Sequence, residues 1–230
     1  MFNNIYIGWD SREDIAFQVC EHSIRRRASE YDATVIPLKQ QELRDRKLYW
    51  RDVDKLSSTE FTITRFLVPY LNDYDGWAVF GDCDMVWRVN PSELFKLRDE
   101  SKAIMVVKHE YDVEEGTKMD GQMQLPYPRK NWSSLILWNC GHPKNRILDL
   151  ETVNTATPRF LHRFEWLDDD DIGELPHAFN WLVGWYDIEH DGDPKIIHYT
   201  EGGPWFEHLQ DVPYAQEWRD AEQEYLNSAK

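Results

Sequence analysis

The feature that most constrains the fold is a series of short apolar runs separated by stretches of helical composition. The runs are NIYIGWD, ATVIPL, WAVF, AIMVVKH, SLILWN and KIIHY, and they are rich in residues that favour strands. Strands that alternate with helices predict an α/β domain with a largely parallel central sheet. In such sheets a ligand lies beyond the carboxyl ends of the strands, so polar residues that directly follow these runs are the candidates for a site.

Two helix starts are predicted from capping-box patterns in the first third of the chain. Ser11 with Asp14, and Ser57 with Glu60, each place a hydroxyl three residues before a carboxylate. The second helix is expected to cover FTITRFLVPYL, with Pro69 bending or ending it.

Length and composition favour one domain over residues 1–230. The chain has 230 residues, of which 41% are hydrophobic, and this is enough for a core without disulfides or a structural metal. Residues 206–230 are expected to form a C-terminal helical extension. The segment 110–129 is rich in Gly, Pro and acidic residues and indicates a long loop, a feature that is often functional.

The formal net charge is −16, which argues against nucleic acid or an anionic membrane as the main partner, because both require a basic face. No apolar run approaches the length of a membrane span, and the first ten residues lack the pattern of a secretory signal. The three cysteines lie far apart without metal-ligand spacing, which favours reduced thiols. Together these features predict a cytoplasmic protein.

The first candidate site follows the run WAVF, where Asp82 and Asp84 flank a single cysteine after Gly81. Carboxylates beside a buried run cost solvation unless something compensates them. If the strand continues, both side chains point the same way and can share one divalent cation, for which carboxylate oxygens favour Mg²⁺ or Mn²⁺. The alternative is a pair of exposed turn aspartates, and the motif alone does not decide between the two.

Two further motifs have both a functional and a structural interpretation. In IIHYTEGGPWF, Gly202 and Gly203 would let backbone N–H groups approach a ligand, and His198 could be a nitrogen ligand to the same cation; the alternative is a core histidine before an ordinary turn. The acidic run 168–171 is either a solvated turn at a helix N-terminus or the source of an active-site carboxylate.

Taken in order, these motifs resemble the family 8 glycosyltransferases of the GT-A fold, including the galactosyltransferase and glycogenin relatives. The resemblance spans residues 3–206 and rests on a first strand ending in Asp10, then STEFTITRFLVPYL, FGDCD, SSLILWN, LDDDDIGELPHAFN and IIHYTEGGPWF. It implies that Asp82 and Asp84 form the DxD motif that binds Mn²⁺ and the donor, and that His198 completes the metal site.

The resemblance also implies roles for the remaining candidates. Asp10 would meet the nucleotide, Arg65 would face the donor, and Asn180 matches the asparagine that ends the family's LP..(F/Y)N segment. Asp168 and Asp169 would be the catalytic carboxylates near the sugar. The two glycines of the C-terminal motif would add backbone donors to the diphosphate.

Three departures from the family pattern make this a divergent member. Glu201 holds the place of a glycine, and Gly203 stands before Pro204 where the family has lysine. The segment 132–134 is Trp-Ser-Ser where asparagine, a small residue and glycine are usual, and Asp169 replaces a glutamine. The sugar therefore cannot be inferred from the family.

The predicted function is transfer of a sugar from a nucleotide-sugar donor, expected to be a UDP-sugar, to an unidentified acceptor with retention of configuration. A cation held by Asp82, Asp84 and His198 would neutralise the diphosphate leaving group. An alternative is a haloacid-dehalogenase-type phosphatase, in which Asp82 is the nucleophile and Asp84 the acid/base, although that motif normally closes the first strand of its domain and two predicted strands precede it here. A sugar-nucleotide-binding relative without activity is the other alternative.

Overall fold

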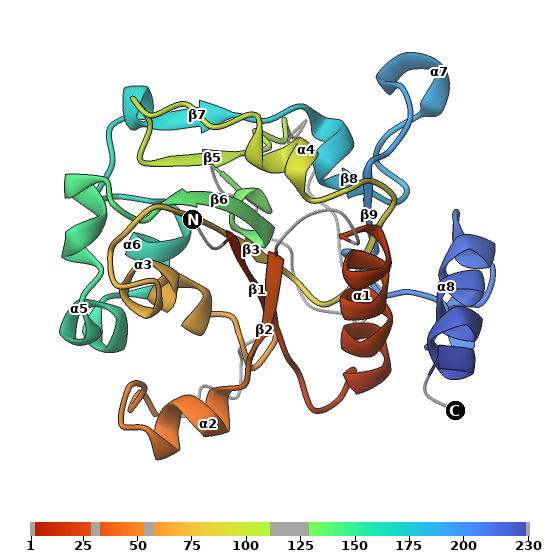
Figure 1. The fold of residues 1–230 in the computed structure, drawn as a ribbon, viewed down its shortest axis with the longest axis horizontal. Coiled ribbons are helices and arrows are strands. Elements are labelled where there is room, and N and C mark those ends of the chain that lie inside the picture. The colour runs from red at the N-terminus through yellow and green to blue at the C-terminus, as the bar shows by residue number, and fades with distance from the viewer. Residues whose placement is uncertain (1–2, 29–32, 53–57, 111–128, 229–230) are drawn as a thin grey trace.

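The computed structural model describes residues 3–28, 33–52, 58–110 and 129–228. Its strands are β1 (Asn3–Gly8), β2 (Ala33–Leu38), β3 (Trp77–Gly81), β4 (Met85–Trp87), β5 (Ile104–Val106), β6 (Leu135–Asn139), β7 (Ile172–Glu174), β8 (Trp181–Leu182) and β9 (Ile196–His198). They form a six-stranded sheet in the order β2–β1–β3–β6–β5–β7 and a three-stranded sheet in the order β4–β9–β8 (Figure 1).

The α-helices surround this sheet and are mostly short. They are α1 (Asp14–Arg27), α2 (Gln40–Asp45), α3 (Val68–Leu71), α4 (Ser92–Phe95), α5 (Leu150–Thr155), α6 (Pro158–His162), α7 (Ile188–Asp191) and α8 (Ala215–Ser228). The 3₁₀ turns that matter for the site are η1 (Thr64–Leu67), η2 (Trp132–Ser134), η4 (Asp169–Asp171) and η5 (His177–Phe179).

The larger sheet is mainly parallel, which confirms the predicted α/β class. Strand β1 runs parallel to β2 and β3, and β5 runs parallel to β7, whereas β6 is antiparallel to both β3 and β5. Both faces of the sheet are covered, so Ile5, Tyr6 and Ile7 are all buried although their side chains alternate between the faces.

The smaller sheet begins where the larger one ends. Only residues 82–84 separate β3 of the larger sheet from β4 of the smaller one. Strand β4 is antiparallel to β9, with Met85 opposite His198. This crossing therefore places the end of β9 beside the carboxyl end of β3, although the two are far apart in the sequence.

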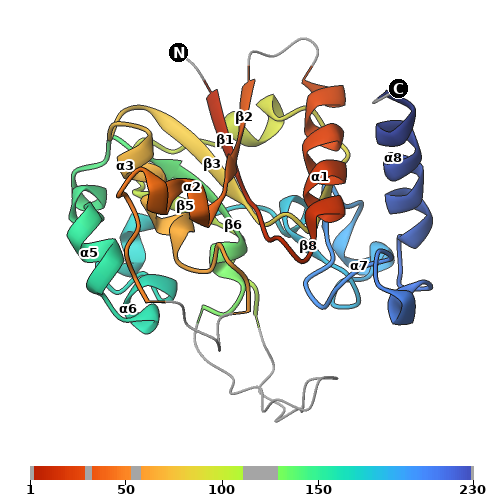
Figure 2. The same cartoon turned by 90° about the horizontal axis from the view of Figure 1, so that it is seen from below.

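The C-terminal segment ends in a helix that packs on the first helix. Helices α1 and α8 lie side by side at one edge of the molecule (Figure 2), and an ion pair joins Arg26 to Glu224. Trp218 of α8 is buried in a small apolar cluster with Val19 of α1. Helical structure was expected over residues 206–230, and α8 forms its larger part.

The predicted capping box of Ser11 and Asp14 does not open helix α1. Helix α1 begins after Glu13, without a side-chain cap, and the Ser11 hydroxyl instead donates to Glu60 Oε1 at 2.5 Å. The FTITRFLVPYL segment forms turns, η1 and α3, and Pro69 lies in the first turn of α3 rather than at its end. Tertiary hydrogen bonds at Glu60 override the local helix signal here. Ser57 and the predicted loop segment 111–128 lie outside the described residues.

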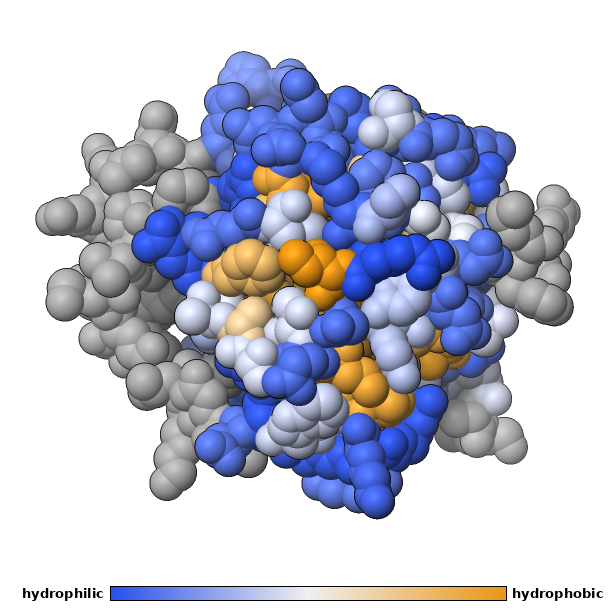
Figure 3. Space-filling view, turned by 90° about the vertical axis from the view of Figure 1, so that its left-hand side faces the viewer, coloured by the Kyte–Doolittle hydropathy of each residue, from blue (hydrophilic) through white to orange (hydrophobic). Residues whose placement is uncertain are grey.

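The face that carries α5 is mostly hydrophilic, with small separate hydrophobic areas (Figure 3). Among the described residues, no helix combines the length and apolar character needed to cross a bilayer. The three cysteines are free thiols and all are buried.

Candidate metal centre

Three side chains predicted to bind a cation meet where the two sheets adjoin. One ligand atom from each of Asp82, Asp84 and His198 lies within 4.8 Å of the other two. Asp82 follows β3, Asp84 precedes β4 and His198 ends β9, so the β4–β9 pairing sets their proximity. The two aspartates reach the same site while Cys83 between them is buried, although the strand does not continue through residues 82–84 as the period-two argument required.

The donor set fits a divalent cation. The Oδ1 atoms of Asp82 and Asp84 are buried, and neither accepts a hydrogen bond from the described residues. His198 Nε2 lies 3.3 Å from Asp84 Oδ1. Buried carboxylate oxygens without a hydrogen bond are costly, and a cation would satisfy both of them. Two carboxylates and one imidazole can together hold a divalent metal ion.

Arg65 lies behind Asp82 and is only 5% exposed. Its Nη1 atom is 3.0 Å from Asp82 Oδ1, an ion pair without hydrogen-bond geometry, and the same nitrogen donates to the Ser133 carbonyl at 2.8 Å. The guanidinium also lies over the Phe80 ring, 4.9 Å from its centroid. Arg65 is thus placed to compensate the charge of Asp82, and its contact with a donor stays a prediction.

The electrostatics of the cluster favour protonation of Asp82 and His198 when no cation is bound. Burial raises the pKa of Asp82 to about 7, against the opposing effect of Arg65. Burial alone would lower the pKa of His198, but the neighbouring carboxylate of Asp84 outweighs it, so this pKa is raised. Metal ligands must be deprotonated to bind, so cation binding here would release protons.

Asp10 is fully buried and its carboxylate is used within the chain. It accepts hydrogen bonds from Arg12 Nε at 2.9 Å, Arg12 Nη2 at 2.6 Å and the backbone N–H of Glu60 at 3.0 Å. Burial would raise the pKa of Asp10, but these hydrogen bonds outweigh it and the pKa is lowered. The side chain ties β1 to residue 60 and has no exposed surface, and the predicted contact of Asp10 with a nucleotide stays a prediction.

The two glycines of IIHYTEGGPWF lie close to other side chains of this chain. Gly202 has φ 99°, and a Cβ added there would lie 2.7 Å from Leu209 Cδ1. A Cβ added at Gly203 would lie 2.1 Å from Trp205 Cζ3. The Trp205 ring thus lies against the Gly203 backbone, and the predicted approach of this backbone to a diphosphate stays a prediction.

Asp168 and Asp169 are not brought to the cluster. They precede β7, which begins level with Ile104 of β5, near the amino end of β3, whereas Asp82 follows the carboxyl end of β3. Lys144 pairs with Asp168, and Asp169 pairs with an arginine. The acidic run forms a capping box at η4, as in the structural alternative, and the catalytic role of these two carboxylates stays an untested prediction.

Asn180 is predicted to bind the cofactor, but it is fully buried behind His198. Its Oδ1 atom lies 2.8 Å from His198 Nδ1, so it contacts the metal ligand rather than the open side of the site. Its contact with a bound donor stays a prediction.

Sequence reasoning missed three residues near the cluster. His109 and Ser134 both contact the Asn180 amide, and Glu13 has its pKa raised to about 7 by burial and then by the nearby carboxylate of Asp84. A signal was available for His109, because it ends the run AIMVVKH, and polar residues at carboxyl ends of strands are the first candidates.

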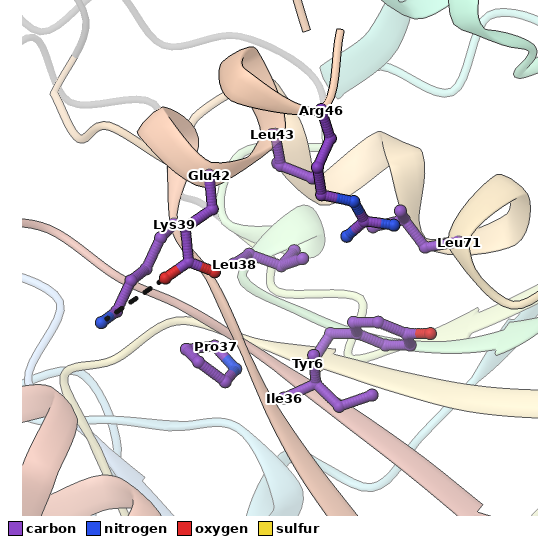
Figure 4. A pocket seen from close by; sticks show the side chains of 9 residues that line it. All are labelled: Tyr6, Ile36, Pro37, Leu38, Lys39, Glu42, Leu43, Arg46 and Leu71. Atoms are coloured by element: carbon purple, nitrogen blue, oxygen red, sulfur yellow. Dashed lines mark ion pairs between the residues drawn. The ribbon is translucent and has the colours of Figure 1, made fainter. Parts of the chain in front are cut away.

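A cavity of about 230 Å³ lies elsewhere, between the outer face of β1 and β2 and the helices α2 and α3 (Figure 4). It shares no residue with the metal cluster. Its lining is Tyr6, Ile36, Pro37, Leu38, Lys39, Glu42, Leu43, Arg46 and Leu71.

The fold is shared with solved glycosyltransferases. The apo form of GlyE from Streptococcus pneumoniae matches with a TM-score of 0.63 and 13% identity, covering 99% of this chain and 63% of that one. The galactosyltransferase LgtC, solved with donor and acceptor sugar analogues, matches with a TM-score of 0.58 and 11% identity over 96% of this chain and 95% of that one. WbbM matches with a TM-score of 0.57 and 14% identity over 98% of this chain and 51% of that one. This chain thus has the predicted GT-A fold and spans less than two thirds of GlyE and WbbM.

No protein-family model matches the sequence. Protein CDI of Arabidopsis thaliana is 50% identical over 229 residues, which cover 98% of this chain and 88% of CDI. At that identity and coverage, the chain belongs to the same family as Protein CDI of Arabidopsis thaliana.

Proposed function

We propose that this chain is a metal-dependent glycosyltransferase that moves a sugar from a nucleotide-sugar donor to an acceptor. The observation that carries the proposal is the cluster of Asp82, Asp84 and His198, with two buried carboxylate oxygens that accept no hydrogen bond from the described residues. It lies at the carboxyl end of a central strand, where ligands bind in α/β sheets, in a fold shared with several glycosyltransferases.

The chemistry of a nucleotide sugar explains why such a cluster would be useful. Its leaving group is a nucleoside diphosphate, and a bound divalent cation supplies Lewis-acid neutralisation of that charge. Asp82, Asp84 and His198 would hold the cation, and Arg65 would keep Asp82 in place from behind. A cation also reconciles an anionic donor with a chain of net charge −16. Mn²⁺ as the metal, a UDP-sugar as the donor and retention of configuration are the specific forms of this proposal.

The first experiment measures whether nucleotide binding depends on the cation. UDP is titrated calorimetrically into the wild-type chain with MnCl₂ and with EDTA, and then into Asp84→Asn, which keeps the side-chain shape but removes a charged ligand. We expect binding with Mn²⁺ only, and its loss in Asp84→Asn. Asp99→Asn is the matched control, because within the described part of the chain this exposed carboxylate accepts hydrogen bonds only from Ser101. Equal UDP affinity with Mn²⁺ and with EDTA would exclude the metal role.

A second experiment separates the proposed transferase from its two alternatives. Wild-type chain with Mn²⁺ is incubated with a panel of nucleotide sugars and, separately, with a simple phosphate ester. Release of nucleoside diphosphate supports sugar transfer or donor hydrolysis. Phosphate release from the ester, lost in Asp82→Asn, would favour the phosphatase. Metal-dependent binding without any turnover would favour a binding protein.

A further inference from the structure

A buried polar network lies directly behind the metal cluster. Asn180 is 0% exposed, and all of its side-chain contacts are within the chain. Its Oδ1 atom is 2.8 Å from His198 Nδ1, and its Nδ2 atom is 2.9 Å from Ser134 Oγ and 3.0 Å from His109 Nε2. The amide therefore has a partner for its oxygen and for each of its two N–H bonds.

The direction of these hydrogen bonds follows from the outer end of the network. The Ser134 hydroxyl donates to the Asn131 carbonyl at 2.7 Å, so its oxygen is left to accept from Asn180 Nδ2. His109 Nε2 accepts the other N–H of that amide, and His109 Nδ1 then donates to the Tyr186 hydroxyl at 2.5 Å. A neutral imidazole has one donor and one acceptor nitrogen, which is consistent with this arrangement.

We propose that Asn180 is a positioning residue that fixes His198 as the tautomer protonated on Nδ1. The Asn180 oxygen can only accept, so the proton of the neutral imidazole is held on that side. The lone pair of His198 Nε2 then faces Asp84 Oδ1 at 3.3 Å, where a cation would bind. This inference rests on the metal role in the proposed function and adds to it the residues that prepare one ligand.

The competing tautomer of His198 explains why a hydrogen-bond acceptor at Nδ1 is needed. Without an acceptor at Nδ1, the neutral His198 would be favoured with its proton on Nε2, because it could donate to Asp84. That proton would block the nitrogen from binding metal. Residues that orient a metal-bound histidine in this way typically change metal affinity by 10–100-fold when they are replaced.

The test measures Mn²⁺ binding alone, by water-proton relaxation, in the full chain without nucleotide. We expect Asn180→Leu to weaken Mn²⁺ binding by about 10–100-fold. The Mn²⁺ affinity of Asn180→Asp should stay within a few-fold of wild type, because a carboxylate still accepts a hydrogen bond from His198 Nδ1. The Ser134 hydroxyl and the His109 imidazole can each reorient to donate a hydrogen bond to this carboxylate. Ser134→Ala should cause a smaller loss of Mn²⁺ affinity, and it replaces Asn180→Leu as the test variant if Asn180→Leu does not fold.

The matched control is Asn145→Leu. Asn145 is also 0% exposed and donates to the carbonyls of Ala103 and Asn139 at 2.8 Å each, away from the cluster. It should lower thermal stability without changing Mn²⁺ affinity. If Asn180→Leu behaves like this control, with lower stability and unchanged Mn²⁺ affinity, Asn180 is only structural and the proposal fails.

A second readout does not depend on metal binding. The ¹⁵N shifts and long-range proton couplings of the imidazole are recorded in the metal-free chain, at a pH where His198 is neutral. We expect the proton on Nδ1 in wild type and on Nε2 in Asn180→Leu. A wild-type proton on Nε2 would overturn the tautomer assignment. If wild type binds no Mn²⁺ but carries the proton on Nδ1, the proposed function fails and the role of Asn180 on His198 stands.

Discussion

The pair of Arg65 and Asp82 offers the sharpest test of how the site is held together. The two side chains are 6% and 15% exposed, with 3.0 Å between Arg65 Nη1 and Asp82 Oδ1. At an effective dielectric constant of about 20, a charge pair at this distance is worth about 5.5 kcal/mol before desolvation is subtracted. Removing one member leaves the other charge buried without its partner, which typically costs 3–5 kcal/mol.

We therefore expect Arg65→Met to lower the free energy of unfolding by about 3–5 kcal/mol. In an Asp82→Asn background, Arg65→Met should lower the free energy of unfolding by at least about 2 kcal/mol less, because residue 82 is then a neutral amide that needs no compensating charge. Arg44→Met is the control. Its guanidinium also lies 4.9 Å from an aromatic centroid and donates to a carbonyl at 2.7 Å, but it has no carboxylate partner within salt-bridge distance among the described residues, so about 1 kcal/mol is expected.

The assay is urea denaturation of the four members of the Arg65/Asp82 cycle in EDTA at pH 8. A coupling energy near zero, with Arg65→Met equally costly in both backgrounds, would refute the view that Arg65 compensates Asp82. Its cost would then come from the ring contact and the Ser133 carbonyl alone.

Four other substitutions test separate parts of the structure. Gly203→Ala should destabilise the chain by about 1–3 kcal/mol by thermal denaturation, because its Cβ would lie 2.1 Å from Trp205 Cζ3. Without metal, Glu13→Gln should be more stable than wild type by about 1–2 kcal/mol above pH 7 and equally stable at pH 4. The reason is that the pKa of the Glu13 carboxyl rises from 4.5 to about 7 on folding, so ionising it costs stability as the pH rises between those values. Asp168→Asn and Asp169→Asn should leave Mn²⁺ affinity unchanged by calorimetry, and their transfer rates test the catalytic role predicted from sequence.

The sequence predicted the part of the structure that local patterns encode. Six strands, the mainly parallel sheet and the metal cluster all followed from apolar runs and from the polar residues at their ends. Strands β4, β7 and β8 were missed, since two or three residues carry too little periodicity to be distinguished from loop. Strand β4 is also hidden because it begins one residue after Asp84, in what looks like the continuation of a single strand.

The roles of individual site residues were harder to predict, because they depend on contacts between distant segments. Asp10 sits at the expected strand end, but Arg12 and the N–H of Glu60 occupy its carboxylate. Gly203 has the predicted lack of a side chain, but Trp205 fills the space. Asn180 matches the asparagine of the family segment, but only the fold shows that it is buried beside His198. In each case the residue type was informative, and its partner was not readable from the sequence.

A final prediction concerns the stability at acid pH of the contact between His162 and Ser133, the residue whose carbonyl accepts a hydrogen bond from Arg65. His162 Nδ1 lies 2.9 Å from Ser133 Oγ, and burial, with a contribution from the nearby Arg65, lowers the pKa of His162 to about 3. The unfolded chain takes up this proton near pH 6.5, whereas the folded chain does not until about pH 3, so stability is lost as the pH falls between these values. At pH 5 the loss from this residue is up to about 2 kcal/mol. His162→Gln keeps a polar group beside Ser133 but cannot be protonated. The free energy of unfolding of both proteins is measured with urea at pH 7 and pH 5. Its decrease from pH 7 to pH 5 should be smaller in His162→Gln than in wild type, by up to about 2 kcal/mol. Equal declines in the two proteins would show that His162 is protonated equally in the folded and unfolded chains.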